Sequence, residues 1–148
     1  MFLYLLMLCA VVGVVALATI VLRRLKNRQV RQDELWFGYE QHMNALREVS
    51  PEAELARVAQ VYQRAKRGTK AVIAWERTGV EQDSWFEGMD PSPGDLLLLR
   101  GSPGWGPDSA SPNVLYVAPG QVLSSMTVEA QAAAARHRHR RTATSVTP

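Results

Sequence analysis

Cysteine is almost absent from this sequence of 148 residues, which contains only Cys9. A single cysteine excludes an internal disulfide. The chain also lacks a G-x-S-x-G nucleophile elbow, and its glycine-rich stretch at 101–106 has no lysine that would make it a phosphate-binding loop. His137 and His139 are the only close histidine pair, and they lie among arginines that repel a cation. We therefore expect no catalytic residue, no metal site and no cofactor.

Charge is absent from the first 22 residues, which also lack proline. A bilayer core of about 30 Å needs roughly 20 apolar residues in a helix, so this run predicts a transmembrane helix over residues 1–22. The basic residues that follow have no acid among them: Arg23, Arg24, Lys26, Arg28 and Arg31. Because such a flank is retained in the cytoplasm, we predict a single-pass membrane protein with its N-terminus outside and its C-terminal body cytoplasmic.

Two other interpretations of the apolar run are possible. Ala16-Leu17-Ala18 resembles a signal-peptidase cleavage site, which would make the chain a secreted protein. Alternatively, the run is a helix buried within a larger complex. No basic residue precedes the run, and the basic cluster after it would resist export, so the transmembrane interpretation is preferred.

The acids are concentrated in the middle of the chain. Residues 32–135 contain all 14 acidic residues and 8 of the 17 basic ones, a formal charge of −6 within a chain of net charge +3. A second acid-free basic cluster lies near the C-terminus: Arg136, Arg138, Arg140 and Arg141. A folded surface that grips phosphates should itself be basic, so nucleic acid is not an expected partner of the body. Both basic clusters are instead candidates for contact with anionic lipid headgroups.

Helical signals dominate residues 23–69. Apolar residues recur at a three-four spacing from Leu25 to Leu46, which predicts a helix with a thinner pattern near 29–33. Ser50-Pro51-Glu52 is typical of a new helix start, and Gly68 of a helix end. We therefore predict a basic juxtamembrane segment followed by an antiparallel helical hairpin.

Short β-rich segments follow in residues 70–126. The predicted strands lie at 71–75, 83–86, 95–100, 113–118 and 121–125. Residues 127–136 predict a short helix, and the rest of the chain to residue 148 a disordered basic tail. The predicted fold class is α+β: a transmembrane helix, a cytoplasmic helical hairpin packed on a small antiparallel sheet or partial barrel, and a disordered tail.

The expected function is protein–protein interaction without catalysis. Trp105, in a glycine-rich loop, and Trp36, on the first helix, are candidate anchors for an unknown protein partner, because interfaces favour tryptophan. Self-association through Trp36, Tyr39, Met43 and Leu46 is one way in which a membrane-tethered adaptor or accessory subunit would work. Two alternatives remain open: a membrane-bound hydrolase that uses the acids Asp90 and Asp95, and a nucleic-acid binder that uses the basic tail.

Overall fold

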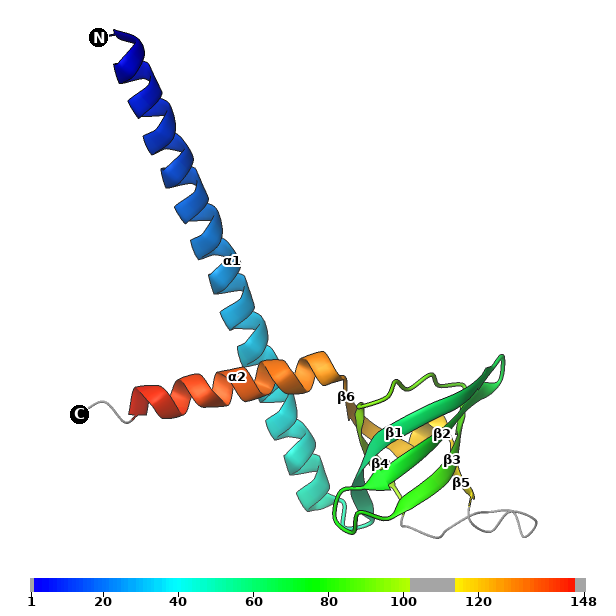
Figure 1. Ribbon diagram of the computed structural model, residues 1–148. Coiled ribbons are helices and arrows are strands. Elements are labelled where there is room, and N and C mark those ends of the chain that lie inside the picture. Colours follow the sequence, from blue (N-terminus) through cyan, green and yellow to red (C-terminus); the bar gives the residue numbers. More distant parts are fainter. Residues whose placement is uncertain (1, 102–113, 146–148) are drawn as a thin grey trace.

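The computed structural model describes residues 2–101 and 114–145, with side chains described for residues 13–101 and 114–144. The described chain is α+β, with a six-stranded curled sheet and the helices α1 (Phe2–Val49) and α2 (Val128–Ser145) (Figure 1). The strands are β1 (Ala53–Ala65), β2 (Gly68–Trp75), β3 (Glu81–Glu87), β4 (Leu96–Arg100), β5 (Val114–Val117) and β6 (Val122–Met126). A short 3-10 helix, η1 (Pro119–Gln121), joins the last two strands.

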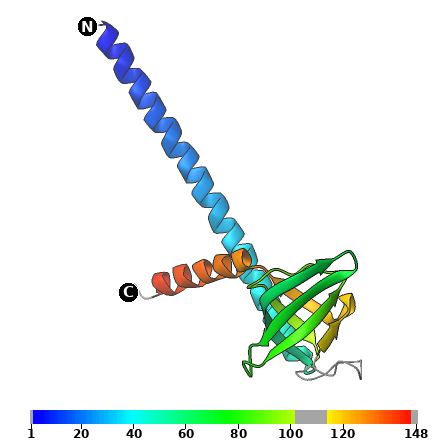
Figure 2. The same ribbon diagram turned by 45° about the vertical axis from the view of Figure 1, so that its right-hand side comes forward.

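Helix α1 continues without a break through the basic cluster and the thin pattern at 29–33. Its N-terminal half extends away from both the sheet and α2 (Figures 1 and 2). Among the described residues, no helix has an apolar stretch long enough to cross a membrane. The described side chains of α1 begin at Gly13, and Arg23, Arg24 and Lys26 follow within a few turns. This finding overturns the prediction of a transmembrane helix over residues 1–22, and with it the predicted single-pass topology.

The predicted helical hairpin is also wrong, because its second helix is a strand. Residues 53–65 form β1, which pairs antiparallel with β2 on one side and with β4 on the other. Side chains at alternate positions of β1, including Ala56 and Val58, are buried in the sheet. Two irregularities in the β1–β2 register, at 58–60 and 61–63, locally increase the twist of the strand. Pairing on both sides therefore overrides the helical preference of this sequence.

The sheet curls because of the order of its strands. That order is β5-β3-β2-β1-β4-β6, so β5 and β6 occupy opposite edges although only 118–121 separate them in the chain. So short a connection requires the two edges to approach each other. The pair β3–β5 is parallel, whereas the other pairs are antiparallel, which corrects the prediction of a purely antiparallel sheet.

Two apolar cores lie on opposite faces of this sheet. The inner core contains Trp75, which is fully buried and donates a hydrogen bond from Nε1 to Gln82 Oε1 at 3.0 Å. The outer core is formed where the sheet meets both helices, with Leu98 and Met126 against Met43 of α1 and Ala130 of α2. The helices are therefore attached to the outside of the curled sheet.

The C-terminal region forms a helix through Ser145 where a disordered tail was predicted beyond residue 136. Thr127 Oγ1 accepts a hydrogen bond of 3.3 Å from the backbone N–H of Ala130, as expected of the N-cap that its position predicts. Figures 1 and 2 show that α2 crosses α1. The polar C-terminal half is helical because it has partners on α1, as described next.

Candidate functional site

The centre of the helix crossing is the carboxylate of Asp33, which is only 1% exposed. Arg136 and Arg140, one turn apart on α2, contact its two oxygens at 2.9 and 2.8 Å. Burial opposes ionisation, but the hydrogen bonds and charges of the two arginines outweigh it and hold the pKa of Asp33 below its ordinary value. Asp33 is therefore an ionised side chain that links the two helices.

Aromatic and charged contacts extend the crossing on both sides of Asp33. The ring of His137 stacks on Phe37 with centroids 4.8 Å apart, and the Arg141 guanidinium lies over the same Phe37 ring at 5.8 Å. Arg138 forms an ion pair with Glu40. Each residue of 136–138, with Arg140 and Arg141, thus has a described partner on α1, which accounts for the order of this basic segment.

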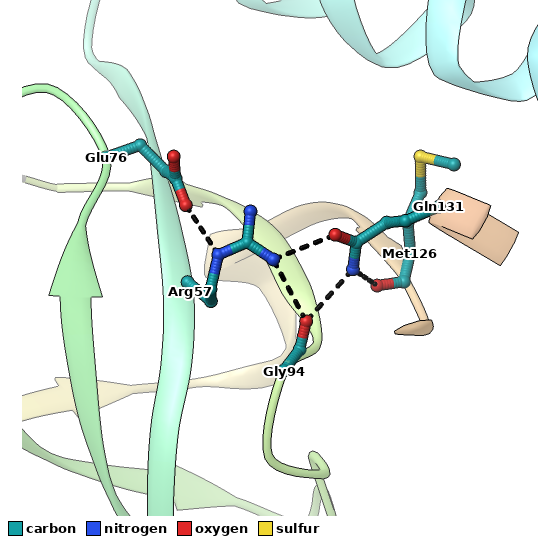
Figure 3. Close-up of polar contacts among 5 residues, drawn as sticks. All are labelled: Arg57, Glu76, Gly94, Met126 and Gln131. Atoms are coloured by element: carbon teal, nitrogen blue, oxygen red, sulfur yellow. Dashed lines mark hydrogen bonds and ion pairs between the residues drawn. The ribbon is translucent and has the colours of Figure 1, made fainter. Parts of the chain in front are cut away.

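A second polar cluster ties the start of α2 to the sheet (Figure 3). Arg57 of β1 donates to Glu76 Oε1 at 2.8 Å, to Gln131 Oε1 at 2.8 Å and to the carbonyl of Gly94 at 3.3 Å. Gln131 of α2 donates in turn to the carbonyls of Gly94 and Met126, both at 3.0 Å. Arg57 and Gln131 therefore fix the position of α2 relative to β1 and to the turn before β4.

The acids of the hydrolase alternative also have structural partners. Asp90 and Asp95 line the same pocket of about 210 Å³. Asp90 Oδ1 accepts hydrogen bonds from Arg64 at 2.6 Å and from Thr69 at 3.2 Å. Asp95 Oδ2 accepts from the backbone N–H of Ser92 at 2.8 Å. These contacts hold the turn before β4 against β1, and the hydrolase alternative remains a prediction without further support.

Comparison with known proteins adds no family to this geometry. No protein-family model, curated protein or solved structure matches the chain. The function must therefore be argued from the described residues alone.

An exposed stripe on α1 is the third feature of interest. We define the α1 seam as six residues that follow the a and d positions of a heptad repeat: Leu22, Leu25, Gln29, Gln32, Trp36 and Tyr39. All are exposed, Leu22 to 64% and Leu25 to 55%. Trp36 and Tyr39 are in edge-to-face contact with centroids 5.8 Å apart, and with Gln32 and Leu35 they line a groove of about 320 Å³. At its lower end, Tyr39 Oη accepts a hydrogen bond of 3.0 Å from Ser124.

The predicted contact residues are distributed over both helices. Trp36 lies on the seam, and Arg23, Arg24, Lys26, Arg28 and Arg31 are exposed on α1. Of the second basic cluster, Arg136 and Arg140 bind Asp33, Arg138 binds Glu40, and Arg141 lies over Phe37. Trp105 lies outside the described residues. Met43 and Leu46, predicted to take part in self-association, pack instead against the chain's own sheet.

Sequence reasoning missed the α1 side of the crossing. Asp33, Phe37 and Glu40 recur at a three-four spacing, which places them on one helix face. Arg136 and Arg140 have the matching spacing on α2. Complementary charges at helical spacing in both segments were the available signal, but it becomes specific only once residues 136–141 are known to be helical.

Proposed function

We propose that this chain is a non-catalytic interaction protein, an adaptor or accessory subunit, which acts through contacts made by the α1 seam. The observation that carries the proposal is the exposure of Leu22, Leu25 and Trp36 on a helix that extends beyond the folded body. A soluble helix normally turns such a stripe towards a core, so an uncovered one indicates a surface that a partner covers.

A second copy of the chain is the partner that fits the seam best. The apolar seam positions Leu22, Leu25, Trp36 and Tyr39 have the spacing with which two helices pair in a coiled coil. Gln29 and Gln32 interrupt the apolar positions, as polar residues do where a seam fixes register. The seam is also continuous with Met43 and Leu46, which follow at the next a and d positions and already pack on the sheet.

The charges of α1 are compatible with this pairing. In the heptad that starts at Leu22, Arg23, Arg24 and Arg31 take the b and c positions, which point away from a paired helix. The face that binds α2, with Asp33 and Phe37, lies about a quarter turn from the seam at 100° per residue. Two copies can therefore pair through α1 while each keeps its own α2 in place.

Substitution of Leu25 by glutamate tests this proposal. We expect the full-length chain to sediment as a dimer at micromolar concentration, and Leu25→Glu to raise the dissociation constant by about a hundredfold or more, because each dimer would bury two unpaired carboxylates. Trp36→Ala should weaken the dimer as well, through loss of an aromatic anchor. Sedimentation equilibrium measures both changes.

Val80→Glu provides a matched control. Val80 is 50% exposed and lies before β3, far from α1 in sequence, so the same change of residue type should leave the dimer intact. A wild-type chain that is monomeric at 100-fold higher concentration, or a Val80→Glu variant that dissociates as readily as Leu25→Glu, would rule out pairing through the seam.

A further inference from the structure

An open notch lies where α2 crosses α1. Its volume is about 540 Å³, and the residues that line it are Val30, His137, Arg140, Arg141, Thr142 and Thr144. Two guanidinium groups and an imidazole thus face a space large enough for a small ligand. Among the described residues that form its walls, none is acidic.

Helix α1 brings further positive charge to the same place. Lys26 precedes Val30 by four residues and Arg23 precedes it by seven, so both lie on the helix face that carries Val30. Both side chains are exposed, and the described ion pairs include neither of them. The two basic clusters, more than a hundred residues apart in sequence, therefore meet at the notch.

The cations on the α2 side are held in place by contacts with α1. Asp33 fixes Arg140 at 2.8 Å, and Phe37 supports both the ring of His137 and the guanidinium of Arg141. The Nδ1 atom of His137 is buried and has no hydrogen-bond partner among the described residues. A buried polar atom of this kind calls for a partner that the chain does not supply. Preorganised donors lose little entropy when they bind an anion.

We propose that this notch binds a small molecule that carries a diphosphate or longer polyphosphate group, with Arg141 and Arg140 of α2 on one side and Lys26 of α1 on the other. Guanidinium groups match phosphate oxygens in a bidentate geometry, and a lysine adds a point charge. One charge of Arg140 is already balanced by Asp33, so a compact polyvalent anion is favoured over a monovalent one.

Titration of the full-length chain with inorganic pyrophosphate, followed by calorimetry at low salt, tests the site. We expect saturable one-to-one binding per chain, and Arg141→Gln should weaken it by about tenfold, because it removes a charge-assisted contact. Lys26→Gln should weaken it as well. Arg67→Gln is the matched control: Arg67 is exposed, is followed directly by β2 and lies outside the notch, so its loss should change affinity by less than about twofold.

The outcomes separate the notch from a general attraction to anions. Equal losses in Arg141→Gln and Arg67→Gln, or no heat of binding at millimolar pyrophosphate, would overturn the proposal. Binding of a single-stranded oligonucleotide that pyrophosphate does not displace would also overturn it, in favour of a nucleic-acid surface. Because the α1 seam lies on another face, Arg141→Gln should leave self-association unchanged, so the failure of one proposal can be distinguished from the failure of the other.

Discussion

Replacement of both Arg136 and Arg140 by alanine is expected to detach the C-terminal half of α2 from α1. The double variant leaves the carboxylate of Asp33, which is 1% exposed, without the two cations that contact its oxygens. An uncompensated buried charge costs about 3–5 kcal/mol, so the docked arrangement should lose most of its population. Hydrogen exchange of the backbone amides of residues 136–145 measures the loss directly.

The pH dependence distinguishes this mechanism from a general loss of helix. In the wild type the pKa of Asp33 is lowered by its arginines, so the stabilisation is complete above about pH 4, the ordinary value of the group, and is lost as the pH falls through the lowered pKa. In the double variant burial acts alone and raises the pKa of Asp33. Acidification from pH 7 towards 4 should therefore strengthen docking in the variant while the wild type stays unchanged.

Arg100→Ala serves as the control for this experiment. Arg100 pairs with Glu52 at 3.2 Å, but both side chains are about half exposed. An exposed ion pair contributes little, so this variant should lose no more than about 0.5 kcal/mol and should keep the wild-type exchange pattern in α2. If Arg100→Ala weakens α2 as much as the double variant does, the buried charge of Asp33 is not what holds the crossing together.

The strands that sequence predicts correctly are those whose local composition agrees with their pairing. Residues 71–75 are short, β-branched and aromatic, and they lie within β2. The run of leucines at 96–99 follows a proline-glycine turn and forms most of β4. In both cases the local preference and the requirement to fill the inner core point to the same structure.

Strand β1 was predicted as a helix because its information is not local. The segment 53–65 is rich in alanine, glutamine and arginine, which favour helices, and Pro51 looks like a helix start. What makes it a strand is pairing with β2 and β4, and the second of these contacts lies more than forty residues away in sequence. A single sequence gives no sign of that contact.

The candidate sites show the same division. Charge counting identified both basic clusters, and tryptophan identified one residue of the α1 seam. Their convergence could not be predicted, because Arg136 finds Asp33 across 103 residues and a polar segment without such a partner would be disordered. The apolar run misled for a related reason: the charge-free stretch at the N-terminus was read by its length, whereas the described helix carries charge from Arg23 onward.

Substitution of Gly94 by alanine should be among the most damaging single changes to the attachment of α2. Gly94 has φ of +88°, and a Cβ there would lie 2.5 Å from Val128 Cγ2 at the first residue of α2. The backbone conformation costs about 1–2 kcal/mol for a residue with a side chain, and overpacking adds about 1–3 kcal/mol. The Gly94 carbonyl also accepts from Arg57 and Gln131, so any shift of this turn weakens both hydrogen bonds (Figure 3).

Two companion variants divide that loss into its causes. Gly79→Ala has a comparable positive φ of +70° but no atom within 4 Å of the added Cβ, so chemical denaturation should report the cost of the backbone conformation alone. Val128 is 48% exposed, so Val128→Ala should cost little by itself and, combined with Gly94→Ala, should recover the overpacking part of the loss. A double variant no more stable than Gly94→Ala would show that Val128 does not press on this turn. The positive φ and the hydrogen bonds of the turn would then account for the requirement for glycine.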